Sequence, residues 1–210
     1  MDKYQTTVNT FDKFAEQYQN KYMQHEPYVA TYQNFCELIN DDHAKLLDIA
    51  CGPGNIAKYL LDQRPGFRLH GIDLAPNMVR LARANNPSAT FDVLDSRAIS
   101  SIDDIFDGVI CGFCLPYLSK QDTLKLIADT RKLLKLGGIF YLSTMEDQYH
   151  KSGYQNSGSG DQVYMHFHEL EYLEAMLVSN GFKIIDIQRK QFSEDQGETA
   201  TDLFIYSEAV

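Results

Sequence analysis

Residues 46–55 read Leu46-Leu47-Asp48-Ile49-Ala50-Cys51-Gly52-Pro53-Gly54-Asn55. An apolar run that ends in an acid and a Gly-Pro-Gly turn, and then continues as a helix, is typical of a strand and helix that flank a ligand. Glycines let the backbone turn tightly and approach a ligand that a Cβ atom would keep away. A helix that begins near Asn55 would point free N–H groups at the same ligand. The stretch therefore predicts a site for a nucleotide-like molecule.

A second acid follows at the spacing that ribose recognition needs. Asp73 ends another apolar run, residues 67–73, and lies about twenty residues after Gly54. A carboxylate at that offset is placed to hydrogen-bond both hydroxyls of a ribose.

Bulk composition narrows the class of protein. The 210 residues suit one well-buried α/β domain and are too few for two comfortable ones. A net charge of −10 opposes non-specific attraction to nucleic acid or to an anionic membrane. No window approaches the ~20 apolar residues of a membrane span. Four irregularly spaced cysteines indicate reduced thiols, so we expect a cytoplasmic protein. From the charge and the hydropathy we expect it to bind neither nucleic acid nor membrane. We expect a monomer or a homodimer.

Strands and helices alternate along the chain, which predicts a doubly wound, Rossmann-like α/β sheet with helices on both faces. We predict helices at 54–63, 76–86, 120–136 and 169–180, and seven strands at 45–50, 67–73, 89–94, 106–112, 138–145, 182–187 and 203–206. The last two strands have no helix between them, so we expect an antiparallel pair and one reversed C-terminal strand in a mostly parallel sheet.

Two further helices, at 7–23 and 27–39, precede the first strand. We expect one domain over residues 1–210, in which 1–42 form a helical cap over the ligand-binding rim and 43–210 form the Rossmann-like core. The low-complexity segment 151–160 is interpreted as a flexible loop, of the kind that often acts as a lid or binding loop.

Several segments occur together in a specific order and spacing. They are Asp48-Ile49-Ala50-Cys51-Gly52-Pro53-Gly54, Gly71-Ile72-Asp73-Leu74-Ala75-Pro76-Asn77-Met78, Phe91-Asp92-Val93-Leu94-Asp95-Ser96, Phe106-Asp107-Gly108-Val109-Ile110-Cys111, Leu136-Gly137-Gly138-Ile139-Phe140 and the closing helix and strand through Gly181-Phe182. Over nearly its whole length the chain resembles the class I S-adenosylmethionine-dependent methyltransferases of the small-molecule type.

The resemblance implies a role for particular residues. Asp48 would anchor the α-amino group of S-adenosylmethionine, Asp73 would take both ribose hydroxyls, and Asp95 would accept from the adenine amino group. The other residues implied to contact the cofactor, or its product S-adenosylhomocysteine, are Tyr18, Ala50, Cys51, Gly52, Gly54, Asn55, Leu74, Met78, Ser96, Cys111, Gly112 and Phe113.

Elementary chemistry agrees with this implication. Acids at the ends of three successive strands suit an ammonium, a diol and an exocyclic amine, and they should converge on one edge of the sheet. The glycine turn has no Lys or Arg, which suits a cofactor without phosphate. The reaction would be an in-line displacement in which a small-molecule acceptor attacks the sulfonium methyl, and most of the chemistry would come from the cofactor.

Two other functions stay open at this point. The turn Gly52-Pro53-Gly54-Asn55-Ile56-Ala57 also fits G-x-G-x-x-A, so the chain could be an NAD(P)-binding oxidoreductase, although it offers no second domain for a hydride acceptor. A methyltransferase fold can also bind S-adenosylmethionine or S-adenosylhomocysteine without catalysis.

Candidate acceptor and catalytic residues come after the fourth and fifth strands. Tyr117, Tyr149, Tyr154 and Tyr164 would line the substrate pocket, either as apolar walls or as rings that hold a cationic amine. Tyr117 and His166 are candidate catalytic residues, with His166 as a general base. We expect no metal, because His166 and His168 lack a third ligand at matching spacing. The nature of the methyl acceptor does not follow from the sequence.

Overall fold

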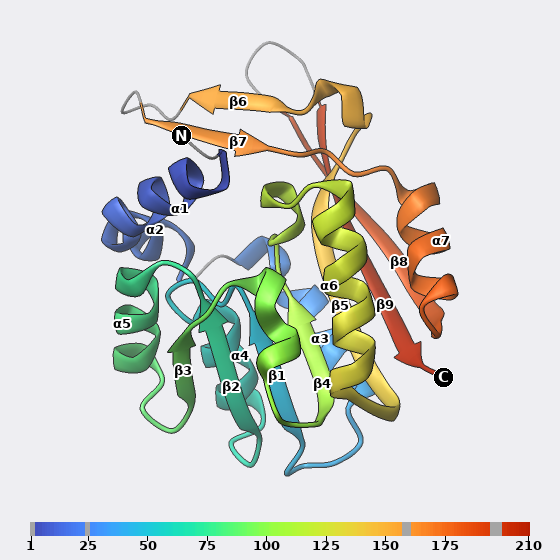
Figure 1. The fold of residues 1–210 in the computed structure, drawn as a ribbon. Coiled ribbons are helices and arrows are strands. Elements are labelled where there is room, and N and C mark those ends of the chain that lie inside the picture. Colours follow the sequence, from blue (N-terminus) through green and yellow to red (C-terminus); the bar gives the residue numbers. More distant parts are fainter. Residues whose placement is uncertain (1–2, 24–25, 157–160, 194–198) are drawn as a thin grey trace.

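The structure, a computed structural model, describes residues 3–23, 26–156, 161–193 and 199–210. Its main sheet has seven strands in the order β3-β2-β1-β4-β5-β9-β8 (Figure 1). The bounds are β1 Lys45–Ile49, β2 Arg68–Asp73, β3 Thr90–Val93, β4 Phe106–Cys111, β5 Leu134–Glu146, β8 Phe182–Ser193 and β9 Thr199–Ala209. Neighbours from β3 to β5 pair in parallel, and β9 runs antiparallel to both β5 and β8. The predicted doubly wound sheet with one reversed strand is confirmed.

Helices cover both faces of this sheet (Figure 1). Successive strand residues point to opposite faces, so Leu47 packs in a core with α6 and α7, whereas Leu46 packs in a core with α3 and α4. Asp48 and Phe204 point to the α3–α4 face. The helices are α1 Lys3–Lys13, α2 Ala15–Tyr22, α3 Val29–Leu38, α4 Asn55–Gln63, α5 Pro76–Asn85, α6 Lys120–Leu133 and α7 Leu170–Ser179, with short 3₁₀ helices at Glu26–Tyr28, Ser96–Ser101, Leu115–Tyr117 and Tyr149–Lys151.

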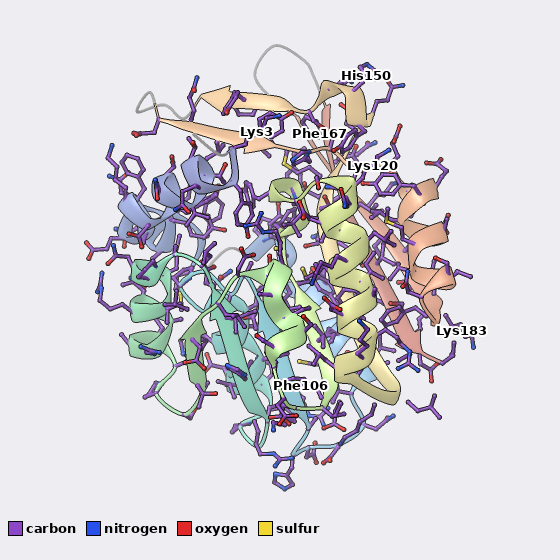
Figure 2. The ribbon with its side chains drawn as sticks, in the orientation of Figure 1. Lys3, Phe106, Lys120, His150, Phe167 and Lys183 are labelled. Carbon is purple, nitrogen blue, oxygen red and sulfur yellow. The ribbon has the colours of Figure 1, made fainter. Side chains whose placement is uncertain are left out.

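The N-terminal helices lie beside α5 at the carboxyl edge of the sheet (Figure 1). The predicted single helix at 7–23 is two helices, because Phe14 leaves the helical conformation with φ −106° and ψ 20°. Figure 2 places Phe106, the first residue of β4, at the opposite edge.

Strand β6 (Gly153–Asn156) lies within the region predicted as a loop at 151–160, and it pairs with β7 (Gln162–Met165) in an antiparallel hairpin. Residues 157–160 lie outside the described residues. The hairpin is held on α1 by backbone contacts. The hydroxyl of Thr7 accepts from the Tyr164 N–H at 3.0 Å, and the hydroxyl of Thr10 donates to the Gln162 carbonyl at 3.0 Å. An ion pair between Lys13 and Asp161 adds a further link.

Several boundaries differ from the sequence prediction. Helix α6 ends at Leu133 rather than 136, because β5 already begins at Leu134 and pairs there with Phe106. Strand β8 extends to Ser193 rather than 187, and β9 covers Thr199–Ala209 rather than 203–206. Residues 194–198, between these strands, lie outside the described residues. No helix in the described ranges combines the length and apolar content that crossing a bilayer requires.

Packing around β2 requires a glycine at position 71. A Cβ atom there would lie 2.4 Å from Phe91 Cδ1 and 3.2 Å from Cys51 Sγ. We expect Gly71→Ala to lower the free energy of unfolding by about 1–3 kcal/mol, measured by urea denaturation. The control is Gly153→Ala, where the nearest atom to the new methyl is 4.0 Å away, and the cost should be about 0.5 kcal/mol or less. Equal losses in the two variants would contradict this packing argument.

Candidate active site

The turn after β1 has an unusual backbone. Ala50, Gly52 and Gly54 all have positive φ, at 56°, 53° and 79°. A non-glycine residue in this region costs energy and is often found at functional sites. The glycines differ in role: a Cβ at Gly52 would have only the Tyr18 ring nearby, at 3.8 Å, whereas one at Gly54 would lie 2.4 Å from Asn86 Nδ2. Gly52 therefore keeps space open above the turn, and Gly54 allows α5 to pack below it.

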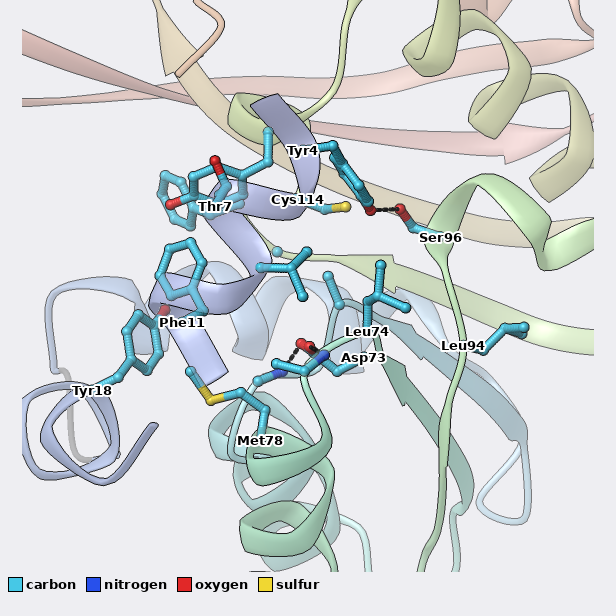
Figure 3. A pocket seen from close by; sticks show the side chains of 17 residues that line it. Tyr4, Thr7, Phe11, Tyr18, Asp73, Leu74, Met78, Leu94, Ser96 and Cys114 are labelled. Atoms are coloured by element: carbon cyan, nitrogen blue, oxygen red, sulfur yellow. Dashed lines mark hydrogen bonds between the residues drawn. The ribbon is translucent and has the colours of Figure 1, made fainter. Parts of the chain in front are cut away.

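Asp73, at the end of β2, holds this turn in place. One of its carboxylate oxygens accepts from the Gly52 N–H at 2.9 Å and the other from the Ala75 N–H at 2.8 Å (Figure 3). Burial raises the pKa of Asp73, and these backbone donors offset only part of that rise. The carboxylate forms part of a cavity wall beside the turn.

Asp48 lies beneath the turn and is completely buried. Neither of its carboxylate oxygens has a hydrogen-bond partner among the described residues. Burial, together with the nearby charge of Asp73, raises the pKa of Asp48 well above its ordinary value. A buried acid in this state gains most from a cation or a water brought next to it.

A cavity of about 740 Å³, including its open mouth, lies between the turn and α1 (Figure 3). Its wall combines apolar side chains with the Asp73 carboxylate. Among the predicted cofactor residues, those that line it are Tyr18, Ala50, Gly52, Asp73, Leu74, Met78, Ser96, Gly112 and Phe113.

A second, larger cavity of about 2330 Å³ including its open mouth adjoins the first. The predicted residues Cys51 and Asn55 line only this one. The residues shared by both cavities are Phe11, Tyr18, Ala50, Gly52, Gly112, Phe113 and Tyr117. The site is therefore one continuous space with two compartments, which suits two ligands that meet at a junction.

The remaining predicted cofactor residues do not line either cavity. Asp48, Gly54 and Cys111 lie behind the wall, and Asp95 is turned toward Arg97. Asp95 accepts from Arg97 Nη2 at 2.7 Å and from the Tyr4 hydroxyl at 3.2 Å. Burial raises the pKa of Asp95, but the Arg97 hydrogen bonds and charge outweigh burial and leave that pKa below its ordinary value.

The predicted acceptor residues separate into two places. Tyr117 lines both main cavities, whereas Tyr149, Tyr164 and His166 line a third, polar cavity that Tyr117 also borders. Tyr154 is exposed and lines none of these cavities.

His166 shares this third cavity with Lys3. The ammonium of Lys3 lies 4.1 Å from the centre of the Tyr164 ring, next to β7 (Figure 2). Burial, and then the Lys3 charge, lower the pKa of His166, so its imidazole is neutral at neutral pH. Tyr117 cannot act as a phenolate base near neutral pH, because burial raises its pKa.

Sequence reasoning missed most of the cavity-lining residues that do not come from the ends of the parallel strands. Helix α1 supplies Tyr4, Thr7, Val8 and Phe11 to the first cavity, and Tyr28 and Asp202 lie in the wall of the second. The signal available was the helical spacing of aromatic residues before the first strand, within the segment predicted as a cap. The described part of the chain brings together no group of three or more His, Cys, Asp or Glu side chains that could hold a metal ion.

Comparison with known proteins gives consistent matches. Residues 46–138 match the family model of a methyltransferase domain. The chain is 34% identical over 109 residues to the ubiquinone biosynthesis O-methyltransferase of Xanthomonas campestris, covering 49% of this chain and 43% of that protein. It is 33% identical over 99 residues to the trans-aconitate 2-methyltransferase of an Enterobacter strain, covering 47% of this chain and 38% of that protein. The chain thus spans less than half the length of these two curated relatives.

A solved structure extends the likeness to the whole fold. Magnesium protoporphyrin IX methyltransferase from Synechocystis, solved with S-adenosylmethionine bound, matches 100% of this chain and 98% of its own with a TM-score of 0.72 and 15% identity. At that identity the likeness concerns the fold alone. The domain match, the curated relatives and the strand order together support a class I S-adenosylmethionine-dependent methyltransferase.

Proposed function

We propose that this chain transfers the methyl group of S-adenosylmethionine to a small organic acceptor. The observation that carries the proposal is the junction of two cavities at the glycine turn, with buried acids on the donor side and aromatic walls on the acceptor side. The relatives named for ubiquinone biosynthesis and for trans-aconitate support a small-molecule acceptor. The net charge of −10 supports a protein that works away from nucleic acid and anionic membranes. We propose a monomer or a homodimer.

The first cavity would hold the adenosine part of the cofactor. We assign the ribose hydroxyls to the Asp73 carboxylate, which keeps lone pairs beyond those used by Gly52 and Ala75. Leu74 and Met78 would pack on the adenine. Ser96 and Tyr4 would face the base edge, since Asp95 is occupied by Arg97.

The methionine part would lie over Gly52, where a side chain is absent. Asp48 would hold its α-amino group through water, because the carboxyl does not line the cavity. Tyr18 would cover this part from α2, since its ring already lies across from Gly52. We propose that residues 1–42 act as the cap that closes both compartments.

When bound, S-adenosylmethionine supplies a sulfonium methyl that an acceptor nucleophile displaces in line. The residues of this chain then have to align the nucleophile and exclude water, which can contribute several kcal/mol. Tyr18, Phe113 and Tyr117 surround the junction where the methyl would lie. Their role would be positioning, since the raised pKa values of Tyr18 and Tyr117 keep both phenols protonated.

We expect S-adenosylhomocysteine to stabilise the protein and NAD to leave it unchanged. At a free concentration of about 100 times Kd the stabilisation should be about 2.7 kcal/mol, measured by thermal shift. Labelled S-adenosylmethionine with a metabolite panel then separates an enzyme from a non-catalytic binder by product formation. Stabilisation by NAD alone would favour the oxidoreductase instead.

Asp73→Asn should weaken S-adenosylhomocysteine about ten- to hundredfold by calorimetry, because charged hydrogen bonds to the ribose are lost. The matched control is Asp92→Asn, on the neighbouring strand β3, which removes the same charge from an exposed site. Urea denaturation of both variants separates a binding loss from unfolding. Unchanged affinity in folded Asp73→Asn would remove the ribose assignment.

Asp48 makes cofactor binding depend on pH. Because its folded pKa is raised, the folded protein keeps a proton that the unfolded chain releases above about pH 3.9, so stability falls as pH rises through this window. An ammonium nearby lowers that pKa again, so binding of S-adenosylhomocysteine should release protons.

Calorimetry in buffers of different ionisation enthalpy, over about pH 5 to 8, measures this release. We expect it to disappear in Asp48→Asn and to persist in Asp92→Asn. Proton uptake on binding, or equal release in both variants, would contradict the role given to Asp48.

A further inference from the structure

Backbone strain in the described residues is concentrated where the two main cavities meet. Ala50 (φ 56°) and Phe113 (φ 53°) are the non-glycine residues with positive φ in this part of the chain, and each lines both cavities. A non-glycine residue in the left-handed region costs energy unless its surroundings hold it there. Ala50 belongs to the turn that Asp73 fixes through Gly52. Phe113 lies on another segment, so a different group has to hold it.

That group is the hydroxyl of Ser143. The parallel pairing of β4 with β5 ends at Cys111 and Leu142. Beyond this last pair, the Phe113 N–H donates to Ser143 Oγ at 3.0 Å. Ser143 is completely buried within β5. Its side chain therefore supplies an acceptor for a backbone N–H at the point where the strand ladder has ended.

Strand β9 supports the ring of Phe113. Phe204 is the cross-strand neighbour of Ser143, and its ring centre lies 6.0 Å from that of Phe113, with the ring planes at 88°. Edge-to-face contacts of this kind are favourable. Gly112 lets the segment lie close to α4, because a Cβ atom there would be 2.5 Å from Ile56 Cδ1. Two adjacent strands and one helix thus fix both the backbone and the ring at the junction.

We propose that Ser143 is a positioning residue, which holds Phe113 in the left-handed conformation so that its ring forms a fixed wall between the donor and the acceptor compartment. Without this hydrogen bond the Phe113 backbone relaxes toward an ordinary conformation, and the ring moves away from the donor ligand. Ser143 lines neither of the two main cavities, so it acts through Phe113. The inference rests on the proposed function for the identity of that ligand, whereas the placing of Phe113 is tested without it.

Hydrogen exchange in the unliganded protein tests the placing, because a buried hydrogen bond slows exchange of its amide. Relative to the amide of Leu142 in the paired part of β5, we expect the Phe113 amide to exchange about tenfold faster in Ser143→Ala than in the wild type. The matched control is Ser207→Ala on β9, which removes an equally buried hydroxyl that donates to the Phe140 carbonyl at 3.2 Å. The control should leave the Phe113 amide as slow as in the wild type. Equal relative exchange in the wild type and Ser143→Ala overturns the proposal.

Calorimetry with S-adenosylhomocysteine tests what the placing does. We expect Ser143→Ala to weaken binding about three- to tenfold, because the ring no longer contacts the donor ligand. In Phe113→Ala the ring is already absent, so adding Ser143→Ala there should change the affinity less than about twofold. Ser207→Ala should bind as the wild type does.

Urea denaturation shows which variants are folded. If Ser143→Ala is unfolded, Ser143→Cys takes its place in both experiments, because sulfur is a weaker acceptor in a side chain of similar size. The same directions of change are then expected, with smaller magnitudes.

The outcomes separate the positioning role from the general function. Equal loss of affinity on Ser143→Ala with and without the Phe113 ring would show that Ser143 does not act through that ring, and would overturn the proposal. Unchanged affinity in Ser143→Ala would overturn it as well. Failure of the wild type to bind S-adenosylhomocysteine would overturn the proposed methyl transfer, whereas hydrogen exchange would still decide whether Ser143 holds Phe113.

Discussion

The hydrogen bonds from Gly52 and Ala75 to the Asp73 carboxylate are the constraint on which the site depends. They join the turn after β1 to the end of β2, so two neighbouring strands share one rigid edge. The same carboxylate remains at the surface of the first cavity. A group that fixes the backbone and also faces the cavity couples the stability of the turn to the shape of the cavity wall at this position.

Around this edge, different parts of the chain build the two compartments. The first cavity is lined mostly by residues at the ends of the parallel strands and by α1, while the wall of the second includes Tyr28 from before α3 and Asp202 from the reversed strand β9. The strand ends follow from the common fold, which the Synechocystis methyltransferase shares over the whole chain. Tyr28 and Asp202 lie outside the matched residues 46–138, whereas Phe113 and Tyr117 in the same wall lie inside them. The outer part of this wall is therefore where the chain can differ most from its relatives.

The sequence was sufficient for the sheet and for the donor edge, because continuous apolar strands and the turn at 50–54 are local patterns. It was insufficient where contacts are long-range. Tyr164 and His166 follow the fifth strand, yet pairing of the Tyr164 N–H with Thr7 carries this region over α1 and into a separate cavity. Asp202 lies just before the strand predicted at 203–206, and only the extended pairing of β8 with β9 places it in the wall. The predicted roles of individual residues stay predictions.

The attachment of α1 to the β6–β7 hairpin has a kinetic consequence. Tyr4, Thr7, Val8 and Phe11 cover the first cavity, and the same helix is tied to Tyr164 through the Thr7 hydroxyl. A molecule held there can leave through the adjoining open cavity or past this helix. Detachment of the helix would open the second route, and its frequency would depend on how firmly the Thr7 and Thr10 hydroxyl groups hold the helix to the hairpin.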